Sequence, residues 1–347
     1  MSLPTTTRQY SYPQRGSYNN LVLTEVPIHA LKANEVLVKT HVVSLQYRDL
    51  LISYEFKNKI PDNLVPLSDM AGQVLAVGSD VRQWKVGDRV CSNFMLDKTH
   101  DELSYDIIAS ALGGAQQGVL TEYRHYPGHA LVAIPEHLSY EEAATLPCAA
   151  ATVWNAFMGG FERVKVGDTI LVQGTGGVSI FAIQFAVAAG ATVIATSSSD
   201  EKLKVATRLG AKHVINYNTN PAWDEEVLRL TNGRGVDRVI EVAGNSTIGR
   251  SMEATRLNGS VDIIGIIGGT DTAPPGDMLL TIMFKGLKLR GIYVASIQQL
   301  KDMMLMIQAH PEATRPVIDR VLDFEDTKSA FAHFESQAHI GKVVIKF

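Results

Sequence analysis

The chain reads Thr169-Ile170-Leu171-Val172-Gln173-Gly174-Thr175-Gly176-Gly177-Val178-Ser179 near its middle. An apolar run ends here in a cluster of glycines, and an alanine-rich stretch to Ala189 and a second apolar run, 192–196, follow it. This order predicts a strand, a tight turn, a helix and a second strand. Such units build a doubly wound α/β sheet.

The same alternation continues along the chain. Further helices are expected at 200–209, 222–230 and 246–257, and further strands at 213–215, 236–241 and 260–264. Strands that are separated by helices predict a parallel sheet with both faces covered.

The two ends of the chain have a different pattern. Residues 18–90 carry short alternating or apolar runs, such as 35–44 and 72–77, between prolines and glycines, which is typical of an irregular β lobe. Helices are expected again at 298–309 and 328–336, and a last strand at 342–347 is expected to rejoin the β lobe. The sequence therefore predicts a β lobe of residues 1–150 completed by 294–347, and a doubly wound domain of residues 151–293.

Composition excludes several classes of protein. The 347 residues are 46% hydrophobic and carry a formal charge of -4 without a basic run, so a large core is expected and a nucleic-acid partner is not. The two cysteines, Cys91 and Cys148, form no CxxC pair, which favours a reducing, cytoplasmic location. The longest apolar stretch, 180–195, is broken by Gln184 and Gly190, and therefore predicts no membrane span.

The glycine turn predicts a dinucleotide site. Gly174 permits the tight turn, and the absence of Cβ atoms at Gly176 and Gly177 lets the backbone approach a pyrophosphate at the helix start. Ser179 stands at the last glycine of the G-x-G-x-x-G pattern. A turn that binds nothing is the alternative, but the strand, helix and second strand around it favour binding. The cofactor-binding residues expected here are Gly174, Thr175, Gly176, Gly177 and Val178.

The end of the second strand favours NADP over NAD. An acidic residue that takes both ribose hydroxyls is common there in NAD sites, whereas this chain has Ser197 followed by Ser198. Hydroxyls remove the repulsion against a 2′-phosphate, and Lys202 can supply positive charge. The serines also suit a helix cap before Asp200, and Lys202 alone also suits a solvated surface.

Several motifs resemble the medium-chain dehydrogenase/reductase superfamily, and in particular its zinc-free, quinone oxidoreductase-like branch. The resemblance covers nearly the whole chain and rests on the glycine turn and on SLQYRDLL at 44–51, WKVGDRV at 84–90, AATLP at 143–147 and GKVVI at 341–345. It implies a GroES-like lobe and a Rossmann lobe with the active site in the cleft, and a homodimer formed by edge strands near 287–294.

The resemblance also implies where zinc would bind in other members. Those members use a Cys in the first motif, a His in a Gly-His-Glu segment and a later Cys or Asp, where this chain has Gln46, Ser68 beside Asp69, and Cys148. One thiolate cannot replace the three protein ligands of a catalytic zinc. The region 91–126, where a structural zinc has four cysteines, contains only Cys91. Neither metal is expected.

The same resemblance assigns further cofactor contacts. Val242, Ala243, Gly244, Ile266, Ile267 and Gly268 are expected to line the nicotinamide and its ribose. Lys342 is expected near the pyrophosphate, and Tyr217 beside the 2′-phosphate.

Tyr47 and Gln46 are the candidate catalytic residues. Tyr47 follows the first metal position, and its phenol can donate a proton or a hydrogen bond to a substrate oxygen, although a packed core tyrosine is an equal alternative. Gln46 replaces the Asn usual in the branch, and Met70 replaces a small residue, so both reshape the expected pocket. Arg48 and Asp49 are interpreted as an ion pair that fixes the turn.

These observations lead to one expected function and two alternatives. Without a Lewis acid, the chemistry suits acceptors that take hydride readily, such as quinones and α,β-unsaturated carbonyls. The hypothesis is an NADPH-dependent oxidoreductase acting on such small molecules. The alternatives are an alcohol or aldehyde dehydrogenase, and a protein that binds NADPH without turnover.

Overall fold

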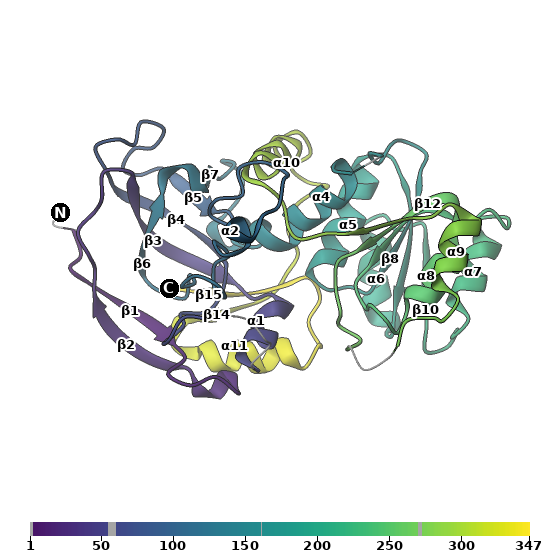
Figure 1. The fold of residues 1–347 in the computed structure, drawn as a ribbon, viewed down its shortest axis with the longest axis horizontal. Helices are drawn as coiled ribbons and strands as arrows, with labels where there is room; N and C mark the ends of the chain where they lie inside the picture. The colour runs from purple at the N-terminus through teal and green to yellow at the C-terminus, as the bar shows by residue number, and fades with distance from the viewer. Residues whose placement is uncertain (1–2, 55–59, 161, 270–272) are drawn as a thin grey trace. The chain divides into compact units, whose positions relative to one another are not determined.

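The structure is a computed structural model that describes residues 3–54, 60–160, 162–269 and 273–347 (Figure 1). The chain divides into two compact units. The first contains Met1–Ala151, Val294–Pro311 and Arg315–Phe347, and the second contains Thr152–Tyr293 and Glu312–Thr314.

The second unit is a parallel α/β sheet. Its strands follow the order β10-β9-β8-β11-β12-β13, and every neighbouring pair is parallel. The strands are β8 (Thr169–Gln173), β9 (Thr192–Ser197), β10 (His213–Asn216), β11 (Val236–Glu241), β12 (Thr255–Ile263) and β13 (Lys288–Gly291). The order reverses between β8 and β11, as it does in Rossmann folds. The predicted parallel α/β domain is confirmed.

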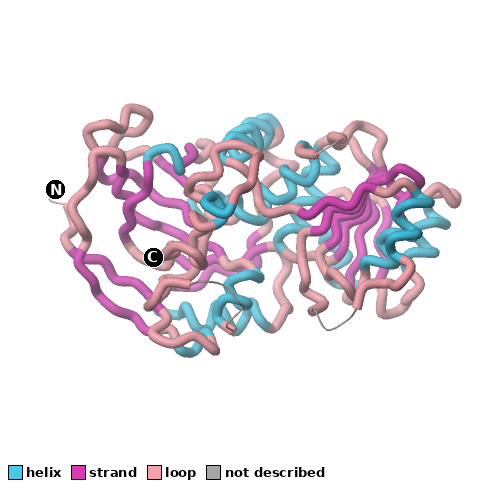
Figure 2. Tube along the Cα trace, viewed as in Figure 1, coloured by secondary structure: helices cyan, strands magenta, loops and turns pink. Residues whose placement is uncertain are grey.

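Helices lie on both faces of this sheet, as Figure 2 shows. They are α4 (Ala151–Met158), α5 (Gly177–Ala188), α6 (Asp200–Arg208), α7 (Trp223–Leu230), α8 (Ile248–Ala254) and α9 (Met278–Lys285). On one face Trp223 and Met252 pack with the strand residues Val239 and Val261 in a buried cluster. Burial of such side chains stabilises the unit by about 1.5–3 kcal/mol each.

The end of the helix expected at 246–257 was predicted wrongly. Helix α8 ends at Ala254, and Thr255 is already extended, with its Oγ1 donating to the Ser251 carbonyl at 2.6 Å. The register between β11 and β12 then shifts, so that 256–259 form a bulge. Leu257 continues the helical spacing of apolar residues but is exposed in this bulge, and the sequence pattern was therefore misleading.

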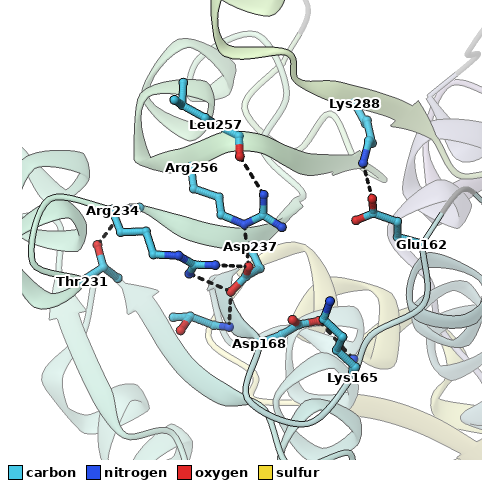
Figure 3. Close-up of polar contacts among 11 residues, drawn as sticks. Glu162, Lys165, Asp168, Thr231, Arg234, Asp237, Arg256, Leu257 and Lys288 are labelled. Atoms are coloured by element: carbon cyan, nitrogen blue, oxygen red, sulfur yellow. Dashed lines mark hydrogen bonds and ion pairs between the residues drawn. The ribbon is translucent and has the colours of Figure 1, made fainter.

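Asp237 ties the amino ends of three strands together (Figure 3). Its carboxylate accepts hydrogen bonds from Arg234 at 2.6 Å, from Arg256 at 2.6 Å and from the Thr169 N–H at 2.8 Å. Burial alone would raise the pKa of the Asp237 carboxyl, but these donors hold it well below its usual range. The charged form of Asp237 is therefore the one that stabilises this end of the sheet.

The first unit is a largely antiparallel β structure. Its sheet has the order β14-β15-β3-β4-β5-β7, with β6 also paired to β3, and a separate pair, β1 with β2, lies beside it. The strands are β1 (Thr6–Ser11), β2 (Val22–Pro27), β3 (Glu35–Ser44), β4 (Asp69–Val77), β5 (Arg89–Ser92), β6 (Tyr123–Pro127), β7 (Leu131–Ala133), β14 (Ile318–Asp323) and β15 (Lys342–Lys346). The C-terminal strand β15 pairs with β3, so this unit is built from both ends of the chain.

Five helices complete the described part of the first unit. They are α1 (Tyr47–Ser53), α2 (Tyr105–Ile108), α3 (Tyr140–Ala143), α10 (Ile297–Ala309) and α11 (Thr327–Glu335), with single turns at Tyr18–Asn20, Gly128–Ala130, Leu146–Ala150 and Phe324–Asp326. Phe331 and Phe334 of α11 pack in one buried cluster with Val343 and Ile345 of β15. Within the described ranges, no helix has the length and apolar character needed to cross a membrane.

Candidate functional site

The turn between β8 and α5 has open space beside the helix start. Gly174 has a φ of +74°, which favours glycine, and a Cβ placed on Gly176 would meet no heavy atom within 4 Å. No side chain caps α5, whose first N–H groups are therefore available to an anion. Ser179, in place of the last glycine, donates from Oγ to the Gln173 carbonyl at 2.6 Å and so fixes the turn. These features fit a dinucleotide pyrophosphate.

The residues expected around the adenosine lie at the ends of two adjacent strands. Ser197 ends β9 opposite Asn216 of β10, and the Tyr217 N–H donates to the Ser197 carbonyl at 3.0 Å. Asn218 Nδ2 donates to the Ser198 carbonyl at 3.1 Å. Ser199 is the N-cap of α6, the helix that carries Lys202. The cap alternative is therefore satisfied by Ser199. Ser197 is buried and its Oγ accepts a hydrogen bond from the Ser199 N–H at 3.4 Å, whereas Ser198 is exposed.

The two loops expected near the nicotinamide lie against each other. The Gly268 N–H donates to the Ala243 carbonyl at 2.9 Å, and the Ile267 N–H donates to the Val242 carbonyl at 3.2 Å. Gly244 has a φ of +84°, and a Cβ there would lie 3.3 Å from the Ile266 Cα. Segments 242–244 and 266–268 thus form one compact wall after β11 and β12.

Glu241 organises this end of the sheet, and the sequence interpretation missed its role. It is fully buried at the end of β11. Its carboxylate accepts hydrogen bonds from the N–H groups of Ala243 and Gly244 and from the side chains of Gln173, Thr247 and Ser251, at 2.5–2.9 Å. The sequence contained one signal of this role, because the charged residue Glu241 ends the strand VDRVIE at 236–241, which is buried throughout.

Gln173 extends this network to the phosphate turn. It immediately precedes Gly174, its Nε2 donates to Glu241 at 2.9 Å, and its Oε1 accepts from the Val242 N–H at 3.2 Å. Glu241 and Gln173 therefore couple the glycine turn after β8 to the loop after β11.

In the first unit, the residues at the three positions where the resemblance places zinc ligands in other members meet at Asp69. Gln46 Nε2 donates to Asp69 Oδ2 at 2.7 Å, and the Cys148 N–H donates to the same oxygen at 2.9 Å. Ser68 Oγ donates to Asp69 Oδ1 at 2.7 Å. Strand pairing explains this, because Asp69 lies opposite Ser44 at the end of β3. Both oxygens of the buried carboxylate are therefore engaged by the chain itself.

Lys342 adds a buried amine to this cluster. Its Nζ donates to the Leu45 carbonyl, next to Gln46. Burial lowers the pKa of Lys342 and raises the pKa of Asp69, while the attraction between their opposite charges opposes both changes. Burial also raises the pKa of the Cys148 thiol, which disfavours the thiolate.

Helix α1 begins beside this cluster. The Gln46 N–H donates to Asp49 Oδ2 at 2.8 Å, so Asp49 fixes the helix start, and burial raises the pKa of its carboxyl to about 6. Arg48 Nη1 lies 3.3 Å from Asp49 Oδ1 and donates to the Leu112 carbonyl at 3.0 Å. These contacts support a structural role for Arg48 and Asp49.

Tyr47 is half-buried and packs against the β-lobe core through its ring. Within the part of the chain that the structure describes, its hydroxyl has no hydrogen-bond partner. The ring is thus held while the hydroxyl keeps its capacity to donate.

Comparison with known proteins agrees with this geometry. A family described as zinc-binding dehydrogenase matches residues 177–309, and one described as alcohol dehydrogenase GroES-like domain matches residues 32–136. A zinc-type alcohol dehydrogenase-like protein of Schizosaccharomyces pombe is 45% identical over 93% of both chains. The chain belongs to the medium-chain dehydrogenase/reductase superfamily.

Two further relatives support the assignment of this medium-chain dehydrogenase/reductase. A solved structure of a candidate alcohol dehydrogenase from Sinorhizobium meliloti has a TM-score of 0.90, 36% identity and full coverage of both chains. Quinone oxidoreductase-like protein 2 of Bos taurus is 27% identical over 94% of this chain and 88% of its own. The protein is an oxidoreductase with a GroES-like domain, a Rossmann-like sheet and a fold that binds a nicotinamide cofactor, as the sequence predicted.

Proposed function

We propose that this medium-chain dehydrogenase/reductase transfers a hydride from NADPH to a quinone or an α,β-unsaturated carbonyl without a catalytic zinc. The observation that carries the proposal is the cluster at Asp69. The Asp69 carboxylate accepts hydrogen bonds from the amide of Gln46, the hydroxyl of Ser68 and the backbone N–H of Cys148.

The donor set at these positions does not fit a catalytic zinc. Zinc in proteins binds thiolates, imidazoles and carboxylates, and a catalytic site provides three of them. Gln46 and Ser68 offer neutral oxygens, so Cys148 is the one thiol among these three positions. Asp69 would have to release its three donors before its carboxylate could bind an ion.

The remaining tasks are coenzyme binding, proton donation and positioning of the donor, and each is assigned to residues of the chain. The Rossmann unit holds the dinucleotide, and the reduced nicotinamide supplies the hydride when it is bound. Tyr47 donates the proton to the substrate oxygen or carbon from its hydroxyl, which has no partner among the residues that the structure describes. Asp69 fixes the Gln46 amide beside Tyr47, so Gln46 serves as a positioning group.

The preference for NADPH is proposed from the residues that are expected around the adenosine of the coenzyme. Ser197 ends β9 without a carboxylate, and Lys202 and Tyr217 are carried by the two segments that follow β9 and β10. Hydroxyls and a cation suit a 2′-phosphate, whereas a carboxylate would repel it.

Initial rates on a panel of acceptors test this proposal. NADPH oxidation is measured with quinones, enones and aldehydes, and NADP⁺ reduction with alcohols, before and after treatment with a chelator. We expect turnover with quinones or enones that survives the chelator. Alcohol oxidation that requires added zinc would favour the alcohol dehydrogenase alternative, which the names of the relatives support. Tight NADPH binding without any turnover would overturn the proposed reaction.

We further propose a homodimer in a reducing, cytoplasmic compartment, acting on small molecules. Strand β13 lies at one end of the sheet order, and α9 exposes Leu279, Leu280, Met283 and Phe284. Both cysteines are free thiols, which supports the proposal of a reducing compartment. Exposed apolar helix faces beside an unpaired sheet edge are favourable surfaces for a second copy.

A further inference from the structure

Two histidines and a glutamate converge on the outer face of the β lobe. His125 of β6 lies opposite Leu37 of β3, and Glu35 lies two residues before Leu37, so the His125 and Glu35 side chains leave the same face of the sheet. His29 follows β2 and reaches the same place, since its ring stacks on that of His125 with 4.0 Å between centroids and 26° between planes.

The ligand atoms of these residues are close together. One nitrogen of each histidine and one oxygen of Glu35 all lie within 4.8 Å of one another. Neutral imidazoles and a carboxylate form a ligand set that zinc prefers.

We propose that His29, Glu35 and His125 form a Zn²⁺ site in which the three side chains leave the remaining position to water. Zinc bonds of about 2.0–2.2 Å bring the ligand atoms of a tetrahedral site to roughly 3.3 Å from one another. Rotation of the exposed His29 and small adjustments of the two half-buried residues suffice for this. Strands β3 and β6 fix the backbones of Glu35 and His125, which limits the entropic cost of assembling the site.

Two contacts of the proposed ligands compete with the metal, because His29 Nδ1 lies 2.9 Å from the Ala30 carbonyl oxygen and Lys32 pairs with Glu35. Lys32 Nζ lies 3.3 Å from Glu35 Oε1. Its side chain is 70% exposed, and a surface ion pair of this kind contributes only about 0–1 kcal/mol, so a zinc ion can displace it. The bond from the Lys32 N–H to Glu35 Oε2, at 3.1 Å, orients the carboxylate.

This site is far from the residues proposed for catalysis. Glu35 begins β3 and Gln46 follows its end, so the ten-residue strand separates them by roughly 30 Å. A zinc ion bound here would take no part in the hydride transfer. Zinc found in the purified protein would therefore not by itself argue for a catalytic metal.

Calorimetric titration with Zn²⁺ tests the site on the full-length chain after treatment with a chelator. We expect one zinc per chain in the wild type, and binding weaker by roughly tenfold or more in His125→Ala and Glu35→Gln. His129→Ala is the matched control, because His129 is an exposed histidine of the same unit that pairs with Asp97. Thermal unfolding with and without Zn²⁺ should show stabilisation in the wild type and the control only.

The outcomes separate this site from the proposed reaction. Absence of zinc binding in the wild type, or equal binding in His125→Ala, overturns the site. Turnover should be the same in His125→Ala as in the wild type. If purified His125→Ala still contains zinc and its turnover requires that zinc, the proposal of catalysis without zinc is wrong as well.

Discussion

At the level of single residues, the hydroxyl of Tyr47 decides whether the chain itself supplies the proton. Tyr47→Phe keeps the ring in the core and removes only the donor. We expect kcat to fall by about tenfold or more, with NADPH affinity little changed, because a proton is transferred only in the transition state. Steady-state kinetics and a fluorescence titration of NADPH measure the two effects. Tyr105→Phe, at a 91% exposed tyrosine, is the control. Unchanged rates with several good acceptors would remove Tyr47 from the mechanism.

Ser197 and Lys202 determine the proposed choice of coenzyme. Ser197→Asp restores the carboxylate that binds ribose hydroxyls, and we expect the ratio of kcat/KM for NADPH over NADH to fall at least tenfold, or about 1.4 kcal/mol. Lys202→Ala should raise KM for NADPH alone. Lys204→Ala controls for charge on the same helix, since Lys204 pairs with Glu201 at 2.6 Å. Equal losses with both coenzymes would show that these residues do not contact the 2′-phosphate.

At the level of elements, Glu241 joins the loops at the carboxyl ends of β8 and β11. Glu241→Ala leaves several buried donors without an acceptor, so we expect the free energy of unfolding to fall by about 3 kcal/mol or more. NADPH binding should weaken too, because the glycine turn loses its link through Gln173. Urea unfolding and NADPH titration measure the two effects, and Glu253→Ala, at an exposed site on α8, is the control. A stable variant with normal affinity would contradict the coupling.

Asp237 plays a similar part at the opposite ends of the strands (Figure 3). The pKa of its carboxyl is lowered in the folded state, below an unfolded value of about 3.9, so its stabilisation is present above that value and is lost as the pH falls toward the folded pKa. Asp237→Asn should therefore cost about 2 kcal/mol at pH 7, and less as the pH drops below about 4. Thermal unfolding across this pH range checks the trend. A difference from the wild type that does not depend on pH would mean that the charge is unimportant.

The sequence predicted those elements whose signals are local. The glycine turn, the strand at 236–241 and the helix beginning near Asp200 follow from neighbouring residues alone. The network at Glu241 could not be predicted in this way, because it joins Gln173, Gly244 and Ser251 through the packing of separate elements. The bulge that exposes Leu257 depends on the pairing of β12 with β11, and the contact of Gln46 with Asp69 depends on the pairing of β3 with β4. Cys148 reaches Asp69 from a separate segment, the turn Leu146–Ala150.

At the level of the whole molecule, α9 and β13 give the strongest argument for a dimer. Met278 and Ile282 of α9 pack on the core, while Leu279 and Phe284 are 79% and 77% exposed. In the described part of the chain, no strand covers the outer edge of β13. Burial of each such side chain contributes about 1.5–3 kcal/mol, and a two-fold axis doubles it.

Phe284→Asp should therefore convert the proposed dimer to a monomer, because it would bury a carboxylate twice in an apolar interface. Light scattering coupled to gel filtration at micromolar concentration measures the mass. Leu305→Asp, at a 65% exposed residue of α10 in the other unit, should leave the mass unchanged. A monomeric wild type would refute the dimer, and a dimer that persists in Phe284→Asp would place the interface on another surface. If α9 forms the interface, thermal unfolding of the wild type should shift upward with protein concentration, whereas that of Phe284→Asp should not.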